Sequence, residues 1–154
     1  MTKVNLADII EQFELASESN KSYLNRNTGE IHLIPEEVEM YFDNEEFDEN
    51  DLPEWEKGII KIEKDIQENP ENYIQFPDQY EINEYSIMEN FSLSLTNKNI
   101  RELVYSSLKG KGAFRKFKDT VNKYGIMDEW YKFRDESIRE LAIEWCEENN
   151  LQYD

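Results

Sequence analysis

The sequence predicts an α+β protein, a mostly helical single domain with about six helices and a small antiparallel sheet built on an N-terminal β-hairpin. Apolar residues recur at helical spacing through most of the chain. Two short strand-like runs, Ser22–Asn25 and Glu30–Ile34, flank a turn in which Gly29 can supply a positive φ. Aromatic residues make up 13% of the chain, which argues for a packed core because disordered acidic chains are usually poor in them.

The N-terminal half supplies the strands and the first helices. Asn5 is a candidate N-cap, with Asp8 three residues later, for a helix that should run to about residue 17. We expect Pro35 to close the second hairpin strand. The remaining expected elements are a short helix anchored by Val38, Tyr41 and Phe42, a helix from near Pro53 to before Pro70 with Asp51 as candidate cap, and a strand at Tyr73–Phe76.

The chain from Tyr80 onward has a helical pattern throughout. The apolar stripes cover residues 82–95, 100–108, 114–124 and 128–149. Gly125 fits the position just after the end of the third of these helices. Leu151–Tyr153 is a candidate edge strand. At 154 residues, we expect a single domain spanning residues 1–154.

The net charge of −18 is unevenly distributed along the sequence. Residues 1–93 carry 24 acidic and 6 basic side chains, whereas residues 94–154 carry 11 of each. Non-specific attraction of the whole chain to DNA is therefore disfavoured. A local basic site in the C-terminal part is still compatible with this distribution.

The scarcity of cysteine and histidine excludes several chemistries. Cys146 is the only cysteine and His32 the only histidine, so zinc sites built on these residue types lack ligands. We expect no metal and no cofactor. No apolar run is long enough to span a bilayer, and acidic residues interrupt the N-terminal apolar stretch. We therefore expect a cytoplasmic protein with no membrane partner.

The sharpest candidate site is the basic segment, Lys109–Lys118, which carries five cations and no carboxylate. A helix that begins near Gly112 would place Lys111, Arg115 and Lys118 on one side, and Phe114 and Phe117 on a packing side. Glycine lets backbone N–H groups approach an anion closely, and a helix N-terminus adds unpaired donors and partial positive charge. The expected ligand-binding residues here are Lys109, Gly110, Lys111, Gly112, Arg115 and Lys118.

An alternative interpretation of the basic segment is purely structural. It could be a helix–helix turn whose cations pair with the acidic N-terminal part of the same chain. The segment matches neither the phosphate-binding loop of nucleoside triphosphatases nor the glycine-rich dinucleotide-binding fingerprint.

Two further stretches are candidates. Residues 36–56 contain 11 acidic residues among 21 and no Lys or Arg, so they could bind a basic protein partner or simply form a solvated acidic surface. In Trp130–Glu136, Tyr131 and Arg134 could stack on a base or hold a phosphate. The structural alternative has Trp130 and Phe133 in the core and the charged residues in ordinary helical ion pairs.

Several segments together resemble a bacterial group known as uncharacterised protein family 0158. They are SYLNRNTGEI (22–31), QYEINEYSIMENF (79–91), GKGAFRKFKD (110–119), YGIMDEWYKFRDE (124–136) and AIEWCEENN (142–150). The resemblance implies one compact domain and supplies no catalytic residues.

Three classes of function are compatible with these patterns. We favour a non-enzymatic binding protein that captures a phosphate-bearing or nucleotide-like ligand at the basic segment. The second is an acidic interaction or inhibitor module, which could mimic nucleic acid. The third is an enzyme with an unrecognised carboxylate site, which we rank last because no nucleophile, metal cluster or cofactor motif is visible. A sheet edge could also allow self-pairing, so a homo-oligomer stays open.

Overall fold

The computed structural model describes the chain except for residues 1–2, 17–19, 43–47, 49 and 51. It divides into two compact units, Met1–Gln79 with Ala142–Asp154 (unit 1) and Tyr80–Leu141 (unit 2). Within the described residues, no helix is both long and apolar enough to cross a membrane. The expected single domain stays a prediction, and the mostly helical α+β class is confirmed.

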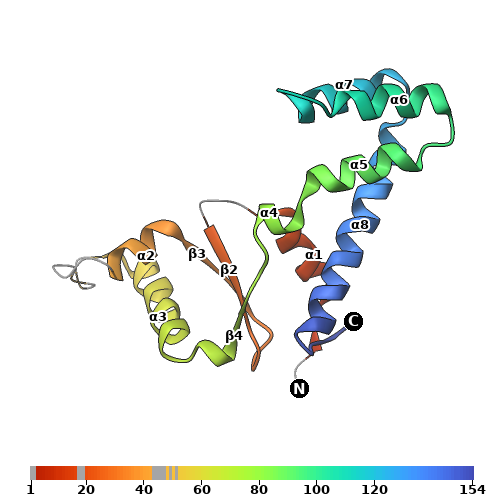
Figure 1. The fold of residues 1–154 in the computed structure, drawn as a ribbon. Helices are drawn as coiled ribbons and strands as arrows, with labels where there is room; N and C mark the ends of the chain where they lie inside the picture. The colour runs from red at the N-terminus through yellow and green to blue at the C-terminus, as the bar shows by residue number, and fades with distance from the viewer. Residues whose placement is uncertain (1–2, 17–19, 43–47, 49, 51) are drawn as a thin grey trace. The chain divides into compact units, whose positions relative to one another are not determined.

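Unit 1 contains the strands and the first three α-helices (Figure 1). Asn5 caps the first helix by accepting a hydrogen bond from the Asp8 N–H, as expected, although the helix ends at Glu14. The expected hairpin, the helix over residues 36–42 and the strand after residue 72 are all present. The elements are β1 (Lys3–Val4), α1 (Leu6–Glu14), β2 (Asn20–Asn25), β3 (Ile31–Pro35), α2 (Glu36–Phe42), α3 (Glu54–Glu68), the 3-10 helix η2 (Pro70–Asn72), β4 (Tyr73–Gln75) and β5 (Gln152–Tyr153).

The three-stranded sheet has the order β3-β2-β4, and both pairings are antiparallel. The face that carries Tyr23 and Ile34 packs against α2 and α3, where Val38, Ile60 and Ile66 complete a buried cluster. On β2 the next position, Leu24, points to the opposite face because side chains alternate along a strand. Figure 1 shows α2 and α3 beside the hairpin.

Aromatic side chains from three separate segments meet in unit 1. Phe76 stacks on Trp145 with ring centroids 4.6 Å apart, and Phe13 of α1 meets both rings edge-on. Trp145 reaches this cluster because the end of the last helix, α8 (Met127–Glu148), belongs to unit 1 from Ala142 onward. The chain ends also meet, since β5 pairs in parallel with β1. The final strand was expected; its partner β1 was not.

Unit 2 is wholly helical. It contains α4 (Gln79–Ile82) except for its first residue, α5 (Glu84–Ser94), α6 (Lys98–Ser107), α7 (Ala113–Lys123) and the first part of α8. The helical pattern expected over residues 82–95 is interrupted at Asn83, which adopts a left-handed conformation and caps α5 through its side chain. Gly125 follows α7 with a φ of 68°, as its position in the sequence predicted.

The core of unit 2 is an aromatic cluster shared by α5, α7 and α8. The Phe117 ring lies 4.8 Å from that of Trp130, and Phe91 contacts both rings edge-on. Phe117 is fully buried, whereas Phe114 is 50% exposed. The expectation that Phe114 packs is therefore wrong. Although it shares a helical side with Phe117, it lies one turn closer to the start of α7, away from this cluster.

The two units differ sharply in charge. Unit 1 contains 25 acidic and 6 basic side chains, a net charge of −19, and unit 2 contains 10 acidic and 11 basic side chains, a net charge of +1. Along the sequence, the excess of acidic residues ends near residue 93. Division of the chain at the unit boundaries, after residues 79 and 141, separates the acidic part from the rest more completely. Unit 1 therefore carries all of the excess negative charge of the chain.

The contrast between Phe117 and Phe114 gives a direct test of the packing. Phe117→Ala should lower the free energy of unfolding by about 3–5 kcal/mol, because it opens a cavity beside Trp130. Phe114→Ala, a chemically identical change on the same helix, should cost less than about 1 kcal/mol. Denaturant unfolding followed by Trp fluorescence and near-UV circular dichroism measures both, and equal losses would contradict this assignment.

Candidate anion site at the α6–α7 connection

The basic segment spans the connection between α6 and α7 and the first half of α7. Gly110 and Gly112 both adopt positive φ values, 80° and 73°, which turn the chain back so that α7 packs along α6 (Figure 1). The Tyr85 hydroxyl donates a 2.9 Å hydrogen bond to the Leu108 carbonyl and so attaches the end of α6 to α5. Both glycines therefore serve the turn.

The start of α7 presents backbone donors. Gly112 is the N-cap, and no side chain caps the helix among the residues described for this unit. The first hydrogen bond of the helix runs from the Lys116 N–H to the Gly112 carbonyl, at 2.9 Å. The N–H groups of the first three helical residues, 113–115, precede that bond and have no carbonyl acceptor within the helix. Together with the helix dipole, these donors favour a negatively charged group.

The expected cations lie in the turn before α7 and on its first two turns. Lys109, Lys111, Arg115 and Lys118 are all exposed. Arg115 pairs with Asp119 at 3.9 Å, but their side chains are 90% and 75% exposed, so solvent screens the pair strongly. Lys111 and Lys118 form no ion pair with any residue of unit 2, all of which the structure describes.

Two lysines of the segment have local contacts. The Lys109 ammonium lies 5.7 Å from the centre of the Tyr105 ring. The Lys116 ammonium donates a hydrogen bond to the Lys109 carbonyl, close to the C-terminal end of α6. A cation at that end of a helix is electrostatically favoured. Lys116 therefore stabilises the connection, a contact that the sequence pattern did not reveal.

Tyr131 and Arg134 have different surroundings. Tyr131 is 52% exposed, whereas Arg134 donates a 2.7 Å hydrogen bond from Nε to Glu84 at the start of α5. This ion pair joins α8 to α5. Trp130 is buried and Phe133 contacts Phe91, as the structural alternative expected. Arg134 thus already has a structural partner, and Tyr131 is the more accessible of the two.

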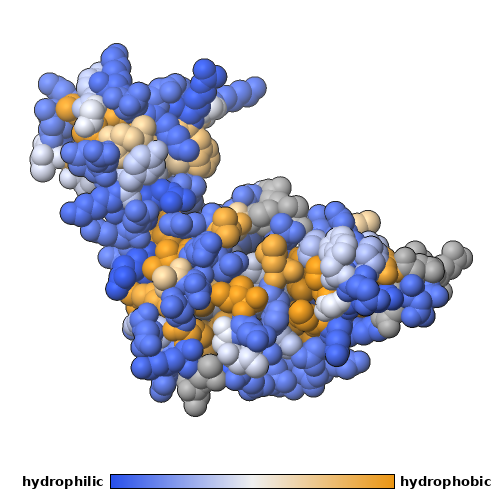
Figure 2. Space-filling view, turned by 180° about the vertical axis from the view of Figure 1, so that it is seen from behind, coloured by the Kyte–Doolittle hydropathy of each residue, from blue (hydrophilic) through white to orange (hydrophobic). Residues whose placement is uncertain are grey.

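The alternative in which the cations pair with the acidic N-terminal part stays a prediction. Figure 2 shows mostly hydrophilic side chains over the α6–α7 region, at its top left.

The acidic candidate stretch, residues 36–56, is only partly described. Residues 43–47, 49 and 51 lie outside the described part of the chain, and these include the expected cap Asp51. The described part includes α2, in which Glu36 and Glu37 are exposed.

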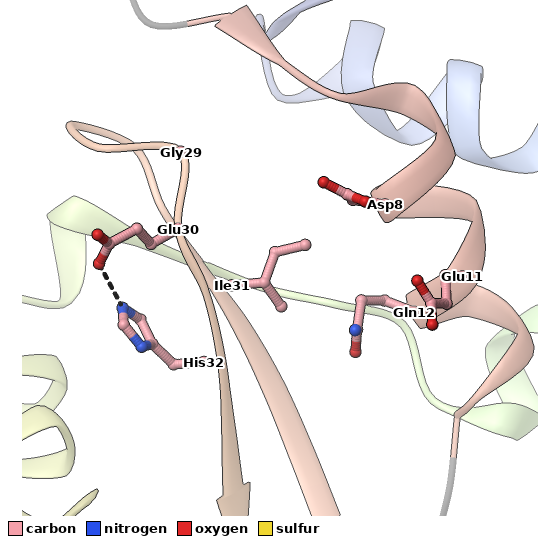
Figure 3. A pocket seen from close by; sticks show the side chains of 7 residues that line it. All are labelled: Asp8, Glu11, Gln12, Gly29, Glu30, Ile31 and His32. Carbon is pink, nitrogen blue, oxygen red and sulfur yellow. Dashed lines mark ion pairs between the residues drawn. The ribbon is translucent and has the colours of Figure 1, made fainter. Parts of the chain in front are cut away.

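A separate pocket in unit 1 lies between α1 and the hairpin turn. It has a volume of about 420 Å³, and its acidic lining consists of Asp8, Glu11 and Glu30. Figure 3 shows Ile31 pointing from the hairpin toward α1. His32 points the other way and pairs with Glu30 at 3.7 Å. The acidic side chains around this pocket disfavour a phosphate. The pocket was not predicted, because the residues of α1 and of the hairpin that line it are some twenty positions apart in the sequence.

These features define a mostly helical α+β protein with an acidic unit and a nearly neutral unit that carries an exposed basic helix start. The sequence matches the Uncharacterised protein family (UPF0158) over residues 2–154, so the chain belongs to that family. A relative from Pseudomonas aeruginosa, the UPF0158 protein PA5073, is 22% identical over 88 residues. The matched region covers 56% of this chain and 58% of that relative. No solved structure matches the chain.

The geometry of the connection can be tested through Gly112. Gly112→Ala should destabilise the protein by about 1 kcal/mol, because a side chain disfavours the left-handed backbone even where space is open. Gly58→Ala is a matched control, because Gly58 lies within α3 and its added Cβ also meets open space. This change should stabilise the helix, since Ala has a higher helix propensity than Gly. Thermal unfolding measures both changes, and a neutral Gly112→Ala would contradict a left-handed backbone at this position.

Proposed function

We propose that this protein is a non-enzymatic binding protein that captures a phosphate-bearing or nucleotide-like ligand at the basic segment. The observation that carries the proposal is the presence of several exposed cations close in sequence to a helix start that no side chain caps. Lys111, Arg115 and Lys118 are exposed and lie within six residues of Gly112, beside backbone N–H groups in the sequence that lack a helical acceptor. Phosphate oxygens accept hydrogen bonds from both kinds of donor.

The half-exposed Phe114 supports a nucleotide-like ligand. Its ring lies on the first turn of α7, next in sequence to Arg115. A base can stack on an exposed aromatic ring, and such stacking contributes about 1–3 kcal/mol. Tyr131 is a second exposed aromatic side chain in the same unit. A small ligand is favoured over a long nucleic acid, because unit 1 would repel an extended polyanion.

Thermal shift in the presence of pyrophosphate or a nucleoside 5′-monophosphate tests the site. A ligand at 100 times its Kd stabilises the folded state by about 2.7 kcal/mol, which should raise the melting temperature by several degrees. The double variant Arg115→Ala/Lys118→Ala should lose this increase. High salt should reduce it in the wild-type protein, because salt screens exposed charges.

A matched control separates binding from general salt effects, since phosphate also stabilises many proteins non-specifically. Lys132→Ala/Arg139→Ala removes the same charge from exposed positions of α8, outside the basic segment. This variant should keep the full wild-type shift. Equal shifts in the two double variants, or none in the wild-type protein, would contradict the proposed site.

The charge of unit 1 favours a second candidate function, an acidic module that binds a basic protein. Its net charge of −19 would accelerate association with a basic partner and make binding sensitive to salt. Residues 36–56 would contribute through the exposed Glu36 and Glu37 of α2.

A pull-down that recovers a basic protein at low salt and loses it at high salt would support this second function. Glu36→Gln/Glu37→Gln should weaken the recovered complex. Glu136→Gln/Glu140→Gln on α8, with the same charge change on exposed residues of unit 2, should leave it unchanged. Equal effects of the two variants would argue against the use of residues 36–56.

A further inference from the structure

Glu63 is a carboxylate inside the core of unit 1. It lies on α3 with only 5% of its surface exposed, between the buried residues Ile60 and Ile66. Its Oε1 accepts a 3.1 Å hydrogen bond from the Gln67 side chain. Its Oε2 is buried and has no hydrogen-bond partner among the described residues. Burial of a charged group without partners is costly, so this placement calls for an explanation.

The nearby charges do not neutralise Glu63. Lys21 of β2 is the favourable cation, but its ammonium pairs with Glu39 of α2 at 3.2 Å. Glu39 itself repels an ionised Glu63. Tyr23, two residues along β2 on the same sheet face, also interacts electrostatically with Glu63. The cluster therefore contains two carboxylates and one cation.

The other titratable groups on this sheet face have partners of their own. His32, which lies opposite Tyr23 in the sheet, pairs with Glu30. Tyr73 donates a hydrogen bond to Asp65, the titratable neighbour of Glu63 on α3. That bond lowers the pKa of the Asp65 carboxyl, and burial together with Asp65 raises the pKa of Tyr73 to about 12. The ionised Asp65 carboxylate and the neutral Tyr73 hydroxyl therefore keep one charge state through the mildly acidic range.

Glu63 responds in the opposite direction from Asp65. Burial raises the pKa of its carboxyl above the ordinary 4.5, Glu39 raises that pKa further, and the Gln67 hydrogen bond and Lys21 oppose the change. Burial also raises the pKa of Tyr23, so this hydroxyl stays neutral and adds no charge to the cluster.

We propose that Glu63, together with Glu39 and Lys21, forms a proton-operated clasp that fastens α2 and α3 to the β2–β3 hairpin. Uptake of one proton removes the buried negative charge and its repulsion from Glu39. It leaves the Lys21–Glu39 ion pair, which connects β2 to α2, with no competing carboxylate. Unit 1 is thus held more tightly in mildly acidic solution and loosens as Glu63 ionises.

The sign of the effect follows from proton binding. Between the ordinary value of 4.5 and the raised pKa of Glu63, the folded state binds more protons than the unfolded state. The stability contributed by this group is therefore greatest below pH 4.5 and is lost as the pH rises through the raised pKa. Asp65 works in the opposite sense, and its contribution is lost only as the pH falls through 3.8 and below.

Two measurements on the intact chain test the clasp. A carbon-13 NMR titration of the side-chain carboxyls, with the Glu63 signal assigned through its bonds to the backbone in the wild-type protein, should show Glu63 titrating above the ordinary glutamate range. Amide hydrogen exchange, corrected for its intrinsic pH dependence, should show greater protection of α2 and α3 at pH 5 than at pH 7.5, because the folded state takes up a proton at Glu63 over this range.

Glu63→Gln, a neutral isostere, should show high protection at both pH values. Glu68→Gln, an exposed carboxylate on the same helix, should keep the wild-type response. An ordinary titration of Glu63, or the same pH response in the wild type and Glu63→Gln, would overturn the proposal. The NMR titration uses the wild-type protein and so decides the matter even if a variant fails to fold.

Discussion

Electrostatic self-repulsion in unit 1 is the constraint on which the rest of this structure depends. Twenty-five carboxylates and only six cations belong to one compact unit, and such an excess destabilises a compact state. Few cations are available for neutralisation, and the ion pairs at Lys3, Lys21 and Lys57 all involve partly exposed groups. Surface pairs of this kind contribute little stability. Burial of apolar area must therefore supply most of it.

The arrangement of the sheet meets this requirement. Because β2 lies in the middle of three strands, one of its faces contributes to the Ile34–Val38–Ile60–Ile66 cluster and the other carries the buried Leu24. The Phe13–Phe76–Trp145 aromatic cluster joins α1, the segment after β4 and the end of α8. Long-range contacts of this kind bury apolar area while leaving most carboxylates in water. Among the described residues, Glu63 is the exception, with 5% of its surface exposed, and the pH response that we propose for unit 1 follows from its burial.

Because the negative charge is concentrated in unit 1, the basic segment of unit 2 has few carboxylates near it in the same unit. In a uniformly acidic protein, the five cations of the basic segment would form ion pairs with neighbouring carboxylates. In unit 2, with a net charge of +1, Lys111 and Lys118 form no ion pair within the unit. The glycine turn precedes a helix start whose first backbone N–H groups have no acceptor within the helix. The anion binding that we propose therefore depends on unit 2, whereas the negative charge of unit 1 disfavours long polyanions.

The sequence by itself determined the local structure: the cap at Asn5, the hairpin around Gly29, the helices with strong apolar stripes and the start of α7. These features depend on neighbouring residues, and their backbone preferences can be read over a few positions. The sequence also located the cations of the basic segment. It held a signal for Glu63, which is three residues from both Ile60 and Ile66, within the apolar stripe of α3.

Only the tertiary structure decided which residues meet. It paired β1 with β5 across the whole chain, assigned Arg134 to Glu84 and Lys116 to the Lys109 carbonyl, and buried Phe117 while leaving Phe114 exposed. It also brought Asp8 and Glu11 together with Glu30 around the pocket. Helical spacing says which side of a helix a residue occupies, but burial depends on whether another element covers that turn. That is set by packing between segments far apart in the sequence.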